Sequence, residues 1–209
     1  MKVVIFDMDG TLIDSKKDIT ISINHVREVH YSLEALSEEF IVEAINMEVR
    51  NLPKLFYGTE EYEKKDRLVF EEHYRTQCTQ NPYLYDGVLD TLQSLVNAGV
   101  KLSVATNAPT QFAKLMLSSL DVEDMFDVII GADEVSASKP SPEMLFKILE
   151  HYSFDASSHK AWMIGDNSKD IQSAQNAKID SLFATWGFSP TSEFENTVAK
   201  PHEILGFVL

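Results

Sequence analysis

The stretch Val3-Val4-Ile5-Phe6-Asp7-Met8-Asp9-Gly10-Thr11 decides the fold, because a short apolar run ends abruptly in two aspartates, a glycine and a threonine. An apolar run rich in β-branched residues predicts a strand buried in a parallel sheet. In open α/β sheets, functional sites lie just beyond the carboxyl ends of the strands. Residues i and i+2 of a strand point to the same face, so we expect the carboxylates of Asp7 and Asp9 to converge. The alternative is an ordinary polar turn, in which Asp-Gly is common.

The composition limits the classes of protein to consider. The 209 residues suffice for one large domain, or for a domain with an insertion, and the 44% hydrophobic content indicates a sizeable core. The formal net charge of -15 argues against nucleic acid or an anionic membrane as a partner. A bound cation can still reverse the field locally and admit an anionic substrate. Cys78 is the only cysteine, so we expect no intrachain disulfide and no cysteine cluster for zinc.

Several familiar motifs are absent from the sequence. No two of the eight glycines are closer than twelve residues, which excludes the dinucleotide fingerprint and the P-loop. Neither G-x-S-x-G nor H-E-x-x-H occurs, and the six scattered histidines are more typical of surface or helix residues than of metal ligands. The sequence shows neither a signal peptide nor an apolar run of transmembrane length, so we expect a cytoplasmic protein.

The order of the predicted elements indicates two domains. Between residues 16 and 80 the pattern predicts only helices, over 16–31, over 37–57 as one or two segments, and over 59–79. From Asn81-Pro82 onward, helices alternate with apolar runs that predict strands at 100–105, 126–130, 161–164 and 182–184. Repeating βα units predict a parallel sheet with helices on both faces. We therefore predict an α/β fold in which a Rossmann-like parallel sheet core, residues 1–15 and 81–209, carries an inserted all-helical domain, residues 16–80.

Polar residues follow the predicted strands at the same edge of the sheet. They are Asp7 and Asp9, Thr106 and Asn107, and Asp166 with Asp170. Lys139 lies in a loop before a predicted helix and is added to this set. Ser168 can cap the predicted helix that contains Asp170. Four carboxylates then face one lysine, a formal charge of −3 before any substrate arrives, so the site predicts a bound cation. The candidate ligands are all hard oxygens, which favours Mg²⁺ over zinc.

Four motifs, in this order and spacing, resemble the haloacid dehalogenase-like superfamily in its phosphatase branch, and the whole chain is most similar to phosphoglycolate phosphatase-like members with a helical cap. The motifs are Asp7-Met8-Asp9-Gly10-Thr11, Thr106-Asn107, Lys139-Pro140 and Gly165-Asp166-Asn167-Ser168-Lys169-Asp170. The resemblance implies that residues 1–15 and 81–209 form an α/β catalytic core domain and that residues 16–80 form the cap domain.

The resemblance also implies roles for individual residues. Asp7 would be the nucleophile that takes the phosphoryl group, and Asp9 would act as general acid and then as general base. Lys139 would neutralise charge on Asp7 and on the phosphoryl group. Substrate would be held by Gly10, Thr11, Thr106, Asn107 and Lys139. Mg²⁺ would be bound by Asp7, Asp166 and the backbone carbonyl of Asp9, with Asp170 supporting the metal directly or indirectly.

The residues leave alternatives open. Asp170 can be only a first-turn residue that favours the helix dipole, Lys139 an ordinary surface lysine, and Thr106 a strand-end residue. For the activity, we expect an Mg²⁺-dependent phosphatase that hydrolyses a small phosphorylated metabolite through an aspartyl-phosphate. A phosphomutase, similar to β-phosphoglucomutase, or a pyrophosphatase would use the same two aspartates. A dehalogenase would lack Asp9, and a non-catalytic binding protein would have lost a motif residue.

The substrate and the oligomeric state stay open at this point. Block 16–80 is the only segment large enough to act as a lid, with hinges at Asp14-Ser15 and near Asn81-Pro82, so we expect it to select the substrate. Phosphoglycolate phosphatase-like chains usually have a glycine where this sequence has Asn46, so another small phosphate, a sugar phosphate or pyrophosphate are alternatives to phosphoglycolate. The chain is expected to be a monomer or a homodimer.

Overall fold

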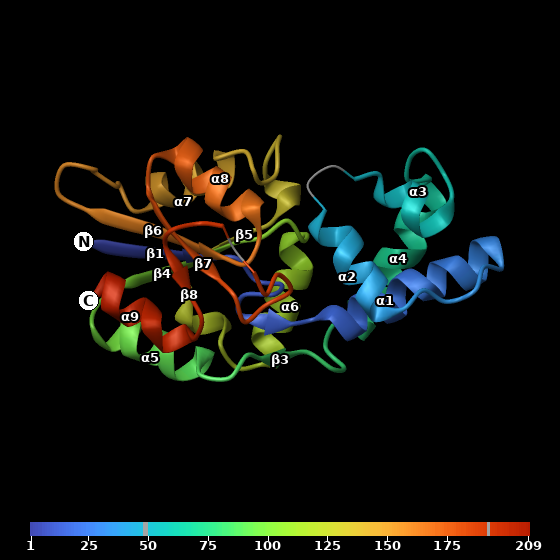
Figure 1. Ribbon diagram of the computed structural model, residues 1–209, viewed down its shortest axis with the longest axis horizontal. Coiled ribbons are helices and arrows are strands. Elements are labelled where there is room, and N and C mark those ends of the chain that lie inside the picture. The colour runs from blue at the N-terminus through green and yellow to red at the C-terminus, as the bar shows by residue number, and fades with distance from the viewer. Residues whose placement is uncertain (48–49, 192) are drawn as a thin grey trace. The chain divides into compact units, whose positions relative to one another are not determined.

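A six-stranded parallel sheet organises the larger part of the chain, with the strands in the order β5-β4-β1-β6-β7-β8 (Figure 1). The computed structural model describes residues 1–47, 50–191 and 193–209. Within this part of the chain, the sheet consists of β1 (Lys2–Phe6), β4 (Lys101–Ala105), β5 (Val128–Ile130), β6 (Lys160–Gly165), β7 (Asp180–Ala184) and β8 (Thr197–Val198). The predicted fold class, an α/β fold with a Rossmann-like parallel sheet, is confirmed.

β1 lies at the centre of the sheet, which explains its apolar sequence. Its backbone pairs with β4 on one side and with β6 on the other, and Val3, Val4 and Ile5 are completely buried. A strand with neighbours on both edges and helices on both faces has no solvent-facing side, so it does not alternate polar and apolar residues. The apolar run that opens the sequence is therefore the innermost strand of the molecule's sheet.

Helices cover both faces of this sheet. α7 (Glu143–His151) and α8 (Ser168–Ala177) lie over one face, and α5 (Val88–Asn97) and α9 (Ile204–Val208) lie over the other (Figure 1). The core under α7 and α8 combines their apolar stripes with the strands, for example Leu145 and Ile148 with Ile5 and Met163. The same part of the chain also contains α6 (Thr110–Ser119) and the short 3₁₀ segments η2 (Glu123–Met125), η3 (Ala132–Glu134) and η4 (Pro201–Glu203).

The chain divides into two compact units, one made of Met1–Asp14 with Leu84–Leu209 and the other of Ser15–Tyr83. The second unit is helical, and its described elements are α1 (Lys16–Val26), the π-helical segment η1 (Arg27–Tyr31), α2 (Glu38–Asn46), α3 (Leu52–Tyr57) and α4 (Lys64–Gln77). The two-residue strands β2 (Ile13–Asp14) and β3 (Tyr83–Leu84) lie where the chain passes from one unit to the other. The helix range expected over 37–57 includes residues 48 and 49, which lie outside the described residues.

A buried aspartate ties the two ends of the second unit together. Asp18, in the first turn of α1, is completely buried and accepts hydrogen bonds from the side chain of Gln77 at 2.7 Å and from the backbone N–H of Asn81 at 3.0 Å. The side-chain amide of Asn81 adds a third bond at 2.7 Å. A buried carboxylate with three donors is well satisfied. The start of α1 and the residues that follow α4 are therefore joined before the chain leaves the unit.

The helix expected over 16–31 is present as α1 and η1 together, and the structure adds short elements that the sequence did not predict, among them β8. β8 pairs with β7 but contains only Thr197 and Val198, too few residues to show a period of two. Near the end of α1 the helix continues as the π-helical η1 and ends at Ser32 in the left-handed conformation. Among the described residues, none of the helices has the length and apolar character needed to cross a membrane.

Candidate active site

The site lies where the strand order reverses. From β1 the chain continues outward to β4 and β5, and it then returns to the other side of β1 to form β6, β7 and β8. Ligands of open α/β sheets bind at such a switch point, outside the carboxyl ends of the strands. Asp7 follows β1 and Asp166 follows β6, and the backbone N–H of Asp7 donates to the carbonyl of Ile164 at 2.8 Å. Two residues far apart in sequence are thereby fixed side by side.

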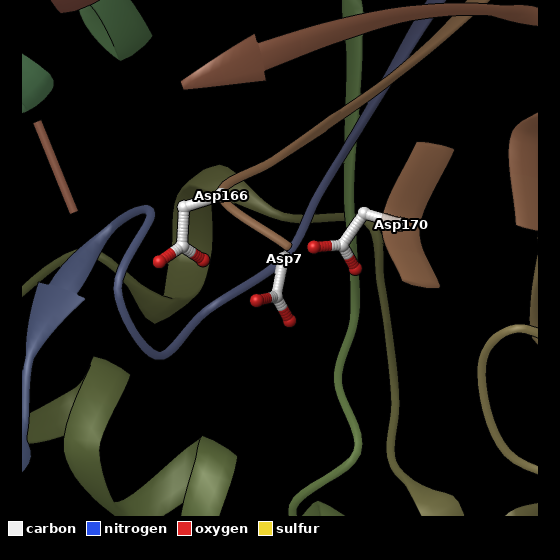
Figure 2. A group of neighbouring side chains, drawn as sticks. All are labelled: Asp7, Asp166 and Asp170. Carbon is white, nitrogen blue, oxygen red and sulfur yellow. The ribbon is translucent and has the colours of Figure 1, made fainter. Parts of the chain in front are cut away.

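Three buried carboxylates gather at this point, from Asp7, Asp166 and Asp170 (Figure 2). One carboxylate oxygen from each lies within 4.8 Å of those of the other two. Asp9 is half-buried, and its carboxylate is not a member of this group. β1 ends at Phe6, so the alternation of a strand does not reach Asp9 and the expected convergence with Asp7 does not follow from it. The buried group therefore has three carboxylates rather than the four counted from the sequence.

Lys139 places its ammonium between two of these carboxylates. Its Nζ donates to Asp7 Oδ1 and to Asp170 Oδ1, each at 2.6 Å, and the residue is 4% exposed. This excludes the alternative of an ordinary surface lysine. The side chain of Asn107 fixes the Lys139 backbone, because Asn107 Oδ1 accepts from the Lys139 N–H at 3.0 Å and Asn107 Nδ2 donates to the Lys139 carbonyl at 3.2 Å. Asn107 thus positions Lys139, and its contact with substrate stays a prediction.

Asp170 uses its two oxygens for different partners. Oδ1 accepts from Lys139, and Oδ2 accepts from the backbone N–H of Asn167 at 3.1 Å. Asn167, not Ser168, is the N-cap of α8, and its side chain accepts from the Lys169 N–H at 3.1 Å. Asn167 caps the helix in place of the expected Ser168 because a capping box needs an acidic residue three positions after the cap, and Asp170 stands there only for Asn167. Asp170 is therefore a first-turn helix residue and a member of the carboxylate group at once.

The Gly10–Thr11 turn packs directly against Asp166. Gly10 has φ +85°, and a Cβ atom there would overlap the Asp166 carboxylate, so only glycine fits. The hydroxyl of Thr11 donates to Asp166 Oδ1 at 3.3 Å, and Thr11 is completely buried. Both residues were expected to hold substrate. The structure gives their side-chain positions a nearer partner, the carboxylate of Asp166, and the substrate contact stays a prediction.

Thr106 follows β4 at the same edge of the sheet. Its backbone N–H donates to the Ile130 carbonyl at 3.0 Å, and its hydroxyl oxygen accepts from the Ala108 N–H at 3.0 Å. The hydroxyl is thus oriented by the turn that follows the strand, and its own proton can be donated to another acceptor. The predicted role of Thr106 in holding a phosphoryl oxygen is compatible with this orientation and stays a prediction.

The three carboxylates perturb one another because they are buried together. Burial raises the pKa of Asp166 well above its usual value, and the charges of Asp7 and Asp170 raise it further. Burial also raises the pKa of Asp170 to about 6, although the ammonium of Lys139 opposes this shift. For Lys139, burial alone would lower the pKa, but the carboxylates of Asp170 and Asp7 outweigh it and raise the pKa above its usual value. Lys139 therefore stays protonated, while the carboxylates compete for protons.

The chemistry of this group fits a divalent cation with a preference for oxygen. Three carboxylates face one ammonium, so the formal charge of these four buried side chains is −2 when all of them are ionised. Each uncompensated charge in a buried site is costly unless it finds a partner of opposite sign. Asp7, Asp166 and Asp170 supply only carboxylate oxygens, the ligands that Mg²⁺ and Ca²⁺ prefer. The group can thus bind a metal, as expected from the sequence.

Comparisons with known proteins give the class to which this fold and site belong. A family model described as haloacid dehalogenase-like hydrolase matches residues 4–184. A phosphoglycolate phosphatase of Aquifex aeolicus is 30% identical over 98% of this chain and 95% of its own length. An N-acetylmuramic acid 6-phosphate phosphatase of Pseudomonas aeruginosa is 29% identical over 90% of this chain and 83% of its own length. The crystal structure of a predicted phosphoglycolate phosphatase from Haemophilus somnus superposes with a TM-score of 0.83 at 21% identity, covering 100% of this chain and 98% of that one.

The chain belongs to the haloacid dehalogenase-like hydrolase family. This confirms the predicted family, and the similarity to phosphoglycolate phosphatases along almost the whole chain confirms the predicted branch. The predicted class of enzyme, a hydrolase of phosphoric monoesters, is confirmed as well.

Replacing the buried ammonium should destabilise the metal-free protein. In Lys139→Gln, the buried carboxylates of Asp7 and Asp170 lose the ammonium that pairs with both of them, and breaking a buried ion pair in this way costs about 3–5 kcal/mol. The free energy of unfolding in chelator should fall by this amount at neutral pH, as measured by urea denaturation. The pKa of Asp166 and that of Asp170 are raised in the folded state, and without the ammonium of Lys139 that of Asp170 rises further, so the loss should shrink as the pH is lowered and protons replace the missing charge.

A matched control is Lys101→Gln, which removes an exposed lysine paired with Asp127 at 3.3 Å. Exposed pairs contribute only about 0–1 kcal/mol. Equal losses in the two variants would contradict the central place given to Lys139.

Proposed function

We propose that the protein is an Mg²⁺-dependent phosphatase that hydrolyses a small phosphomonoester through an aspartyl-phosphate on Asp7. The observation that carries this proposal is the buried group of Asp7, Asp166 and Asp170 around the single ammonium of Lys139. A phosphate dianion would be repelled by the negative charge that remains uncompensated. A divalent cation held by these carboxylates reverses the local field and admits the substrate.

Asp7 and Asp166 would hold the cation, with Asp170 and the backbone carbonyl of Asp9 as further partners. When bound, Mg²⁺ supplies charge neutralisation and polarisation at the phosphoryl group. Mg²⁺ is proposed ahead of zinc because the three side chains offer neither nitrogen nor sulfur.

The chemistry on the protein side needs two carboxylates with different roles. An oxygen of Asp7 forms a bond to phosphorus while the ester P–O bond breaks, and Asp9 gives its proton to the leaving oxygen. Asp9 then takes a proton from a water molecule, the water oxygen bonds to phosphorus, and the bond to Asp7 breaks. Inorganic phosphate leaves and both aspartates return to their starting states. Splitting one displacement into two in this way is ordinary nucleophilic catalysis.

Lys139 and Thr106 are proposed to hold the phosphoryl group during this sequence. The ammonium of Lys139, 2.6 Å from Asp7 Oδ1, orients the nucleophile and is positioned to neutralise charge as phosphorus is attacked. Thr106 would donate the proton of its oriented hydroxyl to a phosphoryl oxygen. Asn107 supports Lys139 by binding its backbone. The Gly10–Thr11 turn supports the proposed metal ligand Asp166.

The substrate class follows from the relatives. Phosphoglycolate and N-acetylmuramic acid 6-phosphate are the compounds named for two of them, and both are small phosphomonoesters. We propose a phosphorylated metabolite of this size, and no nucleic acid, because a net charge of -15 disfavours polyanions. The first motif of this chain ends in Asp9-Gly10-Thr11, which resembles the phosphatase form, whereas the corresponding motif of similar phosphomutases ends in Asp-Gly-Val.

Phosphate release should depend on Mg²⁺. Purified protein should release inorganic phosphate from at least one member of a panel of phosphorylated metabolites, including phosphoglycolate, sugar phosphates and pyrophosphate. Chelator should stop the release and added Mg²⁺ should restore it. Undiminished turnover in metal-free buffer would sink the proposal, and transfer of the phosphoryl group back to the sugar would identify a mutase instead.

The two aspartates should fail in distinguishable ways. Asp7→Asn should abolish turnover, because an amide oxygen is a poor nucleophile, while the variant still folds, as checked by its circular dichroism spectrum. Asp9→Asn should lower kcat by about 10²–10⁴, the contribution typical of general acid–base catalysis. Asp90→Asn makes the same chemical change at an exposed position of α5 and should leave kcat unchanged. Activity near that of the parent in either test variant would refute the role assigned to it.

We further propose that residues 1–15 and 81–209 carry out the chemistry and that residues 16–80 select the substrate. All the groups placed in the mechanism lie in the first unit, so the helical unit is available for recognition. In a chimera whose residues 16–80 come from a relative with a different substrate, the ranking across the metabolite panel should change while Mg²⁺ dependence persists. A folded chimera that keeps the original ranking would show that this block does not select the substrate.

A further inference from the structure

Residues 186–188 follow β7 after one intervening residue, Thr185, and contact the site. They belong to none of the four sequence motifs. β7 pairs with β6, which ends at the Asp166 loop, so the segment emerges beside that loop. The family match ends at residue 184 and therefore does not include these residues. Trp186, Gly187 and Phe188 are half-buried, and each of them reaches either Asp166 or the Gly10–Thr11 turn.

Trp186 anchors the turn that supports Asp166. Its indole Nε1–H donates to the carbonyl of Thr11 at 2.9 Å. The hydroxyl of the same threonine donates to Asp166 Oδ1 at 3.3 Å. Trp186 also lines a small apolar cavity together with Phe6 of β1, Leu12 and Leu92 of α5. The indole thus connects the apolar core to the turn, and the turn connects to the carboxylate.

Phe188 binds the other oxygen of the same carboxylate. Its backbone N–H donates to Asp166 Oδ2 at 2.8 Å. Asp166 therefore has one protein donor on each oxygen, which fixes the plane of the carboxylate. A carboxylate oxygen can accept more than one bond, so both oxygens keep capacity for a cation.

Gly187 sits between these two contacts with no room for a side chain. A Cβ atom there would overlap the carbonyl oxygen of Gly10 and lie 2.7 Å from Asp166 Oδ2. Its φ is not in the left-handed region, so the constraint is steric contact alone. The backbone of Gly187, the backbone of Gly10 and the Asp166 carboxylate are therefore packed in direct contact.

We propose that residues 186–188 are a positioning element that holds Asp166 and the Gly10–Thr11 turn in the arrangement that binds a divalent cation. The inference rests on the proposed function, in which that cation is Mg²⁺. Asp166 is pushed away from Asp7 and Asp170 by like charge, and these contacts hold it in place against the repulsion. Residues that orient metal ligands in this way tune affinity for the metal.

The test is Mg²⁺ binding without substrate, measured by titration calorimetry on Gly187→Ala. The added methyl group should displace the Gly10 carbonyl or Asp166 and weaken Mg²⁺ binding by about 10- to 100-fold, the range typical when such partners are lost. Gly206→Ala is the matched control, because a Cβ atom at Gly206 meets nothing within 4 Å, and its affinity should equal that of the parent. Trp186→Phe removes the indole donor but keeps an aromatic ring at the apolar cavity, and it should give a smaller loss in the same direction.

A second readout separates positioning from general destabilisation. At saturating Mg²⁺, the kcat of Trp186→Phe should return close to that of the parent, while the Mg²⁺ concentration at half-maximal rate is raised. Parent-like Mg²⁺ affinity in both Gly187→Ala and Trp186→Phe would overturn the proposal; if Gly187→Ala does not fold, Trp186→Phe alone decides. A parent protein that binds no Mg²⁺ would overturn the proposed function itself, and is thus distinguishable from failure of this inference.

Discussion

The structure of the site depends on one imbalance: the single ammonium of Lys139 faces the three buried carboxylates of Asp7, Asp166 and Asp170. Like charges at this separation repel strongly where water is excluded. The protein offsets part of this repulsion with neutral donors, since Thr11 and Phe188 bind Asp166, and Asn167 binds Asp170. A divalent cation would neutralise the negative charge that remains. A site that needs a cation for its own stability is also a site that can accept a phosphate dianion once the cation is there.

The parallel sheet makes this concentration of charge possible. The neighbouring strands β1 and β6 are parallel and end at the same edge of the sheet. This brings residues 7 and 166 together, although they are far apart in sequence. The loop that carries Lys139 connects β5 to α7 and is fixed by the side chain of Asn107, which follows β4. The charged groups therefore follow three different strands, β1, β5 and β6, and a residue after β4 fixes Lys139, which explains why the site needs several strands of the α/β unit.

Much of this arrangement could be predicted from the sequence, because apolar runs and residues at strand ends are local signals. The central strand, the alternation of strands and helices after residue 81, and the family were all readable from such signals. The contacts of residues 186–188 were not, because the backbone N–H of Phe188 binds Asp166, 22 positions away, and the indole of Trp186 binds the carbonyl of Thr11, 175 positions away. No spacing rule connects them. The preference for Asn167 over Ser168 as the cap was readable in principle, since Asp170 stands three residues after Asn167, but Ser168 lies nearer the apolar stripe.

The measurement that tests the central claim most directly is the unfolding temperature of the protein at neutral pH, in chelator and in Mg²⁺, beside that of Asp166→Asn. A ligand that binds only the folded state raises this temperature. We expect Mg²⁺ to raise it for the parent protein. In chelator, Asp166→Asn should already be more stable than the parent. Its neutral amide replaces a carboxyl whose raised pKa shows that burial disfavours its charged form. The variant should also respond weakly to Mg²⁺. Equal unfolding temperatures of the parent in chelator and in Mg²⁺, or an equal response of Asp166→Asn, would contradict the account.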